Sequence, residues 1–290
     1  MSDAERSGTR RQEHTVEIRA PAAAVWRAIT EAEEVTRWYV QEAEIDPRPG
    51  GTYRVSWGEG MEGISDIVAF EPDRRLRVEH RPMPGAPEMA APIAEEYTIE
   101  SEGGVTVLRL VTSGIPDTED WDWFYEGTER GWTIFLLGLR HYLERHPGKP
   151  RDQVATMVGL PDSLAEGWSR LVGPEGLGLA DEVADASAGD RYAARTAFGE
   201  ELAGELLMLD PPHRLLATVE DLDDGLLSAT LEEMGGRNFL HLSLGTFGLE
   251  PDTFERVKAR WESWLDDLFP GEAPAEAFQK SYGEPASTPD

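Results

Sequence analysis

The second half of this chain repeats the order of short motifs that ends its first half. Three pairs of segments correspond in order: 70–76 with 209–215, 97–100 with 229–232, and 107–110 with 239–242. Trp132 and Trp261 then take equivalent places in the apolar pattern that follows. The offset between the copies drifts only from 139 to 129 residues, as changes in loop length would cause. Several matches in one order predict a tandem duplication, and a length of 290 residues agrees with about two domains.

Each copy is predicted to combine an antiparallel sheet with one long helix at its end. In the first half, alternating apolar residues predict strands over 14–20, 52–57, 64–70, 76–80, 95–100 and 105–112. Two short helices around Val25 and Val35 follow the first strand, and a long helix is predicted over 119–145, ended by Pro147 and Pro150. Only this helix is long enough to cover the apolar face of such a sheet. The predicted fold class is therefore α+β.

The domain boundaries are predicted from composition and from the repeat. Residues 1–12 are polar and are expected to form a disordered N-terminus. The two domains are assigned to residues 13–148 and 150–269. Residues 270–290 carry four prolines with little apolar content, and we expect a flexible tail there.

The charge balance excludes several partners. The chain has 27 basic and 56 acidic residues, so its net charge is −29. Phosphate backbones and anionic lipid surfaces should repel such a protein, and we expect neither nucleic acid nor membrane as a partner. The acidity fits either adaptation to high salt or the residue usage of a GC-rich genome.

Other features narrow the chemistry further. The chain has no cysteine, which excludes disulfides and thiolate catalysis. None of the six histidines lies in an HExxH motif, and we find no GxSxG or phosphate-binding loop, so we expect no metal site and no cofactor. Residues 1–12 lack the apolar core of a signal peptide and no segment is apolar enough to span a membrane, which favours a cytoplasmic protein.

Motifs in the first half carry a resemblance to a known superfamily. They are Val16–Pro21, Ala24–Thr30, Trp38-Tyr39, Gly50–Tyr53, Phe70-Glu71-Pro72, Gly131-Trp132 and Leu143-Glu144. In this order they resemble the START/Bet v 1-like helix-grip (SRPBCC) superfamily, most of all the family similar to the activator of Hsp90 ATPase homologue 1 (AHSA1). The resemblance covers residues 13–146. The second half resembles the family more faintly, since it lacks a clear first strand and the Gly50-Gly51 pair, although Gly167-Trp168 lies where the first helix belongs.

The resemblance implies two helix-grip domains, each an antiparallel sheet wrapped around a long C-terminal helix. In the superfamily the cavity between sheet and helix binds lipids, sterols, polyketides or other apolar molecules, and a minority of members are cyclases or hydrolases. We expect the second copy to be degenerate and to have lost its cavity. The chain shows no match to the additional domain that stimulates Hsp90 in the co-chaperone, so that activity is not expected here.

Aromatic side chains are the main candidates for a ligand site. An apolar site needs aromatic walls with a few polar groups, and several aromatic residues fall on the strands and the final helix. The candidates are Trp38, Tyr53, Trp57, Tyr97, Trp121, Phe124, Tyr125, Trp132 and Phe135. The alternative is that they fill the core. The cluster Trp121-Trp123-Phe124-Tyr125 at the start of the long helix could instead form a gate or an exposed patch for a partner.

Two polar residues join the candidate ligand site. Asp66 alternates in phase with Ile64 and Val68, on a face expected to be apolar, and a buried carboxylate there could act as an acid or base. Glu96 is in phase with Thr98 and is expected to face solvent. Arg130 could bind a ligand carboxylate, or it could form a surface ion pair with Glu126 or Glu129.

Three functions fit these features, and we assign no catalytic residue for any of them. The first is non-enzymatic binding of a small apolar molecule in the first domain, and a continuous cavity there would favour it. The second is a polyketide aromatase/cyclase-like enzyme, favoured if polar side chains converge inside the domain. The third is a stress- or chaperone-linked interaction module, favoured if the Trp121–Tyr125 patch is exposed.

Overall fold

The computed structural model describes residues 8–58, 62–82, 92–161, 163–234 and 237–270. The chain divides into two compact units, Met1–Gly148 and Lys149–Asp290. The tail predicted over 270–290 lies outside the described residues, apart from Pro270.

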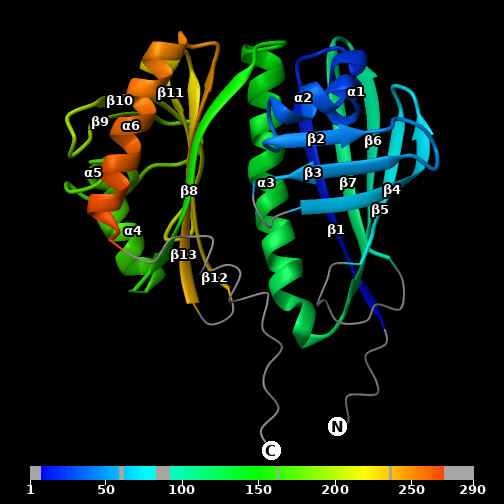
Figure 1. Ribbon diagram of the computed structural model, residues 1–290, viewed down its shortest axis with the longest axis horizontal. Helices are drawn as coiled ribbons and strands as arrows, with labels where there is room; N and C mark the ends of the chain where they lie inside the picture. The colour runs from blue at the N-terminus through cyan, green and yellow to red at the C-terminus, as the bar shows by residue number, and fades with distance from the viewer. Residues whose placement is uncertain (1–7, 59–61, 83–91, 162, 235–236, 271–290) are drawn as a thin grey trace, which may run out of the picture. The chain divides into compact units, whose positions relative to one another are not determined.

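The first unit contains a seven-stranded antiparallel sheet, with the first strand of the chain paired to the last strand of the unit (Figure 1). The strands are β1 (Thr9–Ile18), β2 (Glu42–Ile45), β3 (Thr52–Ser56), β4 (Glu62–Glu71), β5 (Arg75–His80), β6 (Ala94–Glu102) and β7 (Val105–Pro116). The helices are α1 (Ala22–Thr30), α2 (Ala32–Thr36), the 3-10 helix η2 (Glu119–Trp121) and α3 (Asp122–Arg145). The strand order is β1-β7-β6-β5-β4-β3-β2.

The second unit contains a six-stranded sheet in the order β8-β13-β12-β11-β10-β9. Its strands are β8 (Arg151–Leu160), β9 (Arg191–Arg195), β10 (Glu201–Asp210), β11 (Arg214–Val219), β12 (Gly225–Met234) and β13 (Arg237–Phe247). Its helices are α4 (Leu164–Val172), α5 (Ala180–Val183), the 3-10 helix η3 (Glu220–Leu222) and α6 (Pro251–Leu268). Helix α4 begins with a capping box, in which Ser163 and Glu166 satisfy each other's backbone N–H groups.

Both units follow one plan, which confirms the α+β class and the two helix-grip domains. Each begins with a strand that pairs with its last strand, continues with two helices, and ends with a long helix. Two expectations were wrong in detail. Strand β8 is a clear first strand of the second copy, and β1 begins at Thr9, so residues 9–12 belong to a strand rather than to a disordered end.

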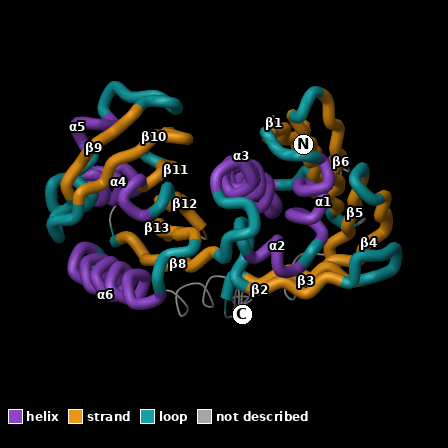
Figure 2. The backbone as a smooth tube through the Cα atoms, turned by 90° about the horizontal axis from the view of Figure 1, so that it is seen from above, coloured by secondary structure: helices purple, strands orange, loops and turns teal. Residues whose placement is uncertain are grey.

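The core of the first unit lies between the inner face of its sheet and its helices. The sheet contributes Ile18, Ile67, Leu76, Leu108 and Leu110, which are fully buried. Helix α3 adds a buried stripe at helical spacing: Trp132, Leu136, Leu139 and Leu143. Figure 2 shows β4, β5 and β6 curving around α1, with α3 on the open side of the sheet.

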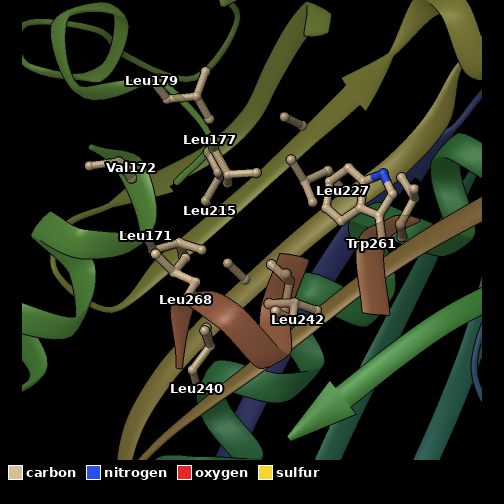
Figure 3. Packing of buried hydrophobic residues seen from close by; sticks show 14 of the residues in the cluster. Leu171, Val172, Leu177, Leu179, Leu215, Leu227, Leu240, Leu242, Trp261 and Leu268 are labelled. Atoms are coloured by element: carbon tan, nitrogen blue, oxygen red, sulfur yellow. The ribbon is translucent and has the colours of Figure 1, made fainter. Parts of the chain in front are cut away.

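The core of the second unit is built from aliphatic residues and tryptophans. Leu171 of α4, Leu227 of β12 and Trp261 of α6 are each at most 1% exposed (Figure 3). Around them the sheet and helices contribute further leucines and valines. This unit therefore has the packed apolar interior that stabilises a domain of its size.

The Gly50-Gly51 turn between β2 and β3 provides a stability test. A Cβ at Gly51 would lie 2.0 Å from the carbonyl oxygen of Asp46, whereas one at Gly50 would meet no heavy atom within 4 Å. Gly50 has a φ of 79°, so Gly50→Ala is expected to cost about 1 kcal/mol. Gly51→Ala should cost more, because backbone must move. Urea unfolding of both variants measures this order, and equal losses would contradict it.

Candidate functional site

A buried carboxylate, an imidazole and a phenol meet on the inner face of the first sheet. The Tyr97 hydroxyl donates a hydrogen bond to Oε2 of Glu95 at 3.0 Å. Nε2 of His80 lies 3.3 Å from Oε1 of the same carboxylate, in the geometry of an ion pair rather than of an aligned hydrogen bond. Glu95 is only 9% exposed. We call Glu95, His80 and Tyr97 the Glu95 cluster.

The surroundings of the Glu95 cluster shift the proton affinities of its members. Burial lowers the pKa of His80, but the charge of Glu95 and the contact with it raise the pKa by more, so it lies above its ordinary value. Burial, together with the charge of Glu95, raises the pKa of Tyr97 well above its usual range. Tyr97 therefore keeps its proton at neutral pH and acts as a hydrogen-bond donor.

Four aromatic rings gather around Tyr39, which follows α2: its neighbour Trp38, Trp57 directly after β3, and Trp132 and Phe135 of α3. The ring centroid of Tyr39 lies 5.1 Å from Trp38, 5.1 Å from Trp57, 5.2 Å from Trp132 and 4.9 Å from Phe135. Trp132 also meets Tyr97 edge-on at 5.9 Å. Burial, followed by the charge of Glu95, raises the pKa of Tyr39 well above its usual range. The aromatic cluster thus borders the Glu95 cluster.

Most of the predicted aromatic residues lie in or beside this region. Trp38, Tyr53, Tyr97 and Trp132 are buried, while Trp57 and Phe135 are half-buried. Two polar tips are held by α1: the Trp38 Nε1 donates to the Ala28 carbonyl at 2.7 Å, and the Tyr53 hydroxyl donates to the Ile29 carbonyl at 3.3 Å. The structure brings these residues together, and ligand contact remains a prediction.

The orientation predicted for Asp66 was wrong. Its side chain is 49% exposed and pairs with Arg81 at 2.7 Å, while its neighbours Ser65 and Ile67 are buried. Ile64 and Val68 suggested the opposite phase, but Val68 is an exposed apolar residue, and β4 has an irregularity between Ile67 and Ala69.

The other polar candidates pair on the surface of the unit. Arg130 forms an ion pair with Glu126 at 3.4 Å, one turn earlier on α3, as in the second of its predicted roles. Glu96 pairs with Arg75 at 2.7 Å and is partly exposed. Neither belongs to the Glu95 cluster.

The aromatic segment at the start of α3 divides between core and surface. Trp121 is 2% exposed and packs with Ile93 and Ile115, with Phe124 and Tyr125 against them. Trp123 is 42% exposed. Of the two alternatives for this segment, a gate or an exposed patch, the exposed patch does not hold for Trp121, which is a core residue.

Sequence reasoning missed Glu95, His80 and Tyr39. The strand pattern does predict that Glu95 points inward, because it alternates in phase with Tyr97 and Ile99. Both of these residues have large apolar side chains, and both are buried. Its neighbour Glu96, the carboxylate considered from the sequence, points to the opposite face of β6. His80 and Tyr39 lie at the ends of predicted elements, where the phase of a pattern is least defined.

An open pocket of about 690 Å³ lies in the second unit. Helix α6 provides Arg260, Trp264 and Leu268, and the β9–β10 turn provides Phe198, whose ring centroid is 5.0 Å from that of Trp264. The second copy was expected to have lost the cavity between its sheet and its long helix, and this pocket, which is open to solvent, does not test that expectation.

Because His80 lies beside the Glu95 carboxylate, we expect the stability of the first unit to depend on pH. A histidine whose folded pKa lies above its unfolded value stabilises the fold fully below the unfolded pKa and loses that contribution as the pH rises through the folded pKa. The difference in unfolding free energy between the wild type and His80→Gln should therefore shrink from pH 5.5 to pH 8.5. Urea titrations at both pH values measure it, and NMR titration should show a lower His80 pKa in Glu95→Gln. A pH-independent difference would contradict the coupling.

Among the residues that the structure describes, no three His, Asp or Glu side chains gather as metal ligands would. In the same part of the chain, no helix combines the length and apolar character needed to cross a bilayer.

Residues 19–144, inside the first unit, match the family model described as activator of Hsp90 ATPase homolog 1-like protein. A search of curated proteins found no match.

Among the solved structures matched, one aligns with about half of this chain and two align with most of it. The Aha1 dimer from Colwellia psychrerythraea is 20% identical with a TM-score of 0.42, and the match covers 48% of this chain and 98% of that one. The di-domain ARO/CYC protein BexL from the BE-7585A biosynthetic pathway is 14% identical with a TM-score of 0.43, covering 95% and 99%. DynU16, a putative protein in the dynemicin biosynthetic locus, is 18% identical with a TM-score of 0.41, covering 90% and 96%.

Proposed function

Because residues 19–144 match the AHSA1-like family model, we propose that the first unit binds a small, largely apolar molecule between its sheet and α3. The observation that carries the proposal is the set of aromatic rings around Tyr39, which borders the polar Glu95 cluster through the contact of Trp132 with Tyr97. Ligand sites combine aromatic walls with a few fixed polar groups in this way. In this proposal the second unit does not bind the molecule.

The test uses the purified full-length protein. Native mass spectrometry should show a co-purifying small molecule, and the neutral dye Nile red should gain fluorescence on binding. Tyr39→Ala removes the ring that contacts four others and should weaken dye binding about tenfold, the effect of losing about 1.4 kcal/mol.

Phe198→Ala is the matched control, because Phe198 lines the pocket of the second unit. It should leave dye binding unchanged. Loss of binding in Phe198→Ala but not in Tyr39→Ala would move the site to the second unit. A protein that emerges empty and takes up no dye would refute ligand binding altogether.

The same cluster favours an acid–base enzyme as a second candidate function. Glu95 and His80 form a carboxylate–imidazole pair with a protonated phenol 3.0 Å from the carboxylate, so a proton acceptor and a proton donor lie side by side. Such a set suits the aromatase/cyclase-like chemistry proposed from the resemblance. With a poly-β-keto thioester as probe, Glu95→Gln should abolish any product that mass spectrometry detects while Nile red still binds. Equal product from the wild type and Glu95→Gln would exclude this role.

A further inference from the structure

Three polar residues lie side by side across the inner face of the first sheet. Gln12 of β1 pairs with Thr112 of β7, and Thr112 pairs in turn with Glu95 of β6. Directly paired residues of neighbouring strands point to the same face, about 5 Å apart. All three are buried, with 5%, 0% and 9% of their surface exposed. We call Gln12, Thr112 and Glu95 the polar row.

The polar row keeps unused hydrogen-bonding capacity. The side-chain nitrogen of Gln12 donates to the main-chain carbonyl of Tyr125 at 2.5 Å, which fixes the amide so that Oε1 points elsewhere. That Oε1 atom and the Oγ1 atom of Thr112 are both buried and have no hydrogen-bond partner among the described residues. Each such group costs about 1–3 kcal/mol when it stays unsatisfied.

The second copy shows that the fold does not require the polar row. The equivalent row across β8, β13 and β12 is Val154, Leu244 and Leu227, joined by the same strand pairings and equally buried. The place of His80 is taken by Val219, also buried. One copy therefore has a fully apolar row, and the other keeps three polar side chains at a cost to stability.

The chemistry of the polar row defines what can satisfy it. Gln12 Oε1 only accepts hydrogen bonds, a carboxylate at Glu95 only accepts, and the Thr112 hydroxyl can do both. A bound carboxylate would bring a second negative charge beside Glu95, which already has His80 as its ion-pair partner, and would place acceptor atoms against Gln12 Oε1 and the Glu95 oxygens, so that within the row only the Thr112 hydroxyl could donate to it. A hydroxyl or an amine offers donors to Gln12 Oε1 and to the Glu95 oxygens, and a hydroxyl can also accept a hydrogen bond from Thr112.

We infer that the polar row selects apolar ligands that carry a hydroxyl or amine and rejects ligands that carry a carboxylate. This inference rests on the proposed ligand-binding function and names the class of molecule that the same site takes. It excludes fatty acids and favours hydroxylated aromatic or polycyclic molecules, whose rings would meet the aromatic side chains around Tyr39.

The experiment compares three probes of one ring system on the full-length protein: naphthalene, 2-naphthol and 2-naphthoate. Titration by tryptophan fluorescence should show 2-naphthol binding about tenfold more tightly than naphthalene, as one hydrogen bond worth about 1.4 kcal/mol would give. Naphthoate should bind more weakly than naphthalene. Naphthoate binding as tightly as naphthol would overturn the inference, while naphthalene binding would still support the proposed function.

Variants then locate the preference in the polar row. Thr112→Val and Gln12→Leu should reduce the preference for naphthol over naphthalene to less than threefold. Thr246→Val is the control, since Thr246 is a fully buried threonine on β13 of the second unit, and it should keep the full preference. A preference unchanged in Thr112→Val would overturn the inference.

Thermal unfolding separates an open hydroxyl from one that a structural water satisfies. Thr112→Val without ligand should keep or raise the melting temperature, because it removes an unsatisfied group. A lower melting temperature together with an unchanged naphthol preference would assign the hydroxyl to water and overturn the inference. If none of the three probes binds, the proposed function fails and the inference fails with it.

Discussion

Trp132→Ala is expected to lower the unfolding free energy of the first unit by about 3–5 kcal/mol, the usual cost of deleting a buried tryptophan. Trp132 is 3% exposed and contacts the rings of Tyr39, Tyr97 and Phe135. Its removal leaves a cavity bordered by the Glu95 cluster. Hydrogen exchange followed by mass spectrometry on the full chain should show faster exchange in the sheet of the first unit.

Trp261→Ala is the matched control for that measurement. Trp261 holds the equivalent place in the second copy and is 1% exposed. The loss should be of similar size, but the faster exchange should appear in β11, β12 and β13. Normal exchange throughout the first unit in Trp132→Ala would show that Trp132 does not support its core.

The second large effect is expected at the start of α3, where two tryptophans two residues apart should behave differently. Trp121→Ala should cost about 3–5 kcal/mol, because Trp121 packs on Ile93 and Ile115 in the core. Trp123→Ala should cost much less, about 0.5 kcal/mol, because Trp123 is 42% exposed and lies outside the core. Guanidinium unfolding of both variants measures this.

The outcome also decides what the segment does. Equal and small losses of unfolding free energy would show that Trp121 is exposed, which would support an exposed patch at this segment. Equal and large losses would mean that Trp123 is buried in solution.

The fold was predictable because its signals are spread over many residues. Strand alternation, the helical spacing from Trp132 to Leu143 and the internal repeat each involve whole segments, so an error at one position changes little. The first strand of the second copy was missed because β8 buries only Val154, Val158 and Leu160, and Ala155 on the other face is exposed. A strand with so few buried residues gives a weak pattern.

The site was less predictable because it depends on single side chains. Asp66 and Glu95 lie on neighbouring parts of one sheet, yet a shift of one residue in phase places one outside and the other inside. The polar row joins Gln12 to Thr112, about 100 positions away in the chain, and Thr112 to Glu95 on the neighbouring strand. Periodicity within one segment contains no information about such pairings.

The pairing of β1 with β7 has a consequence for how the first unit forms during synthesis. Strand β1 leaves the ribosome before its partner β7, which ends only at Pro116, so about 100 residues must follow before the sheet can close. At about 5–20 residues per second, this interval lasts roughly 5–20 seconds. Such distant pairing slows folding, because the chain loses the entropy of a long loop before the contact forms. During this interval Gln12 lies on a strand without its β7 partner, so the polar row can form only after Thr112 has been synthesised.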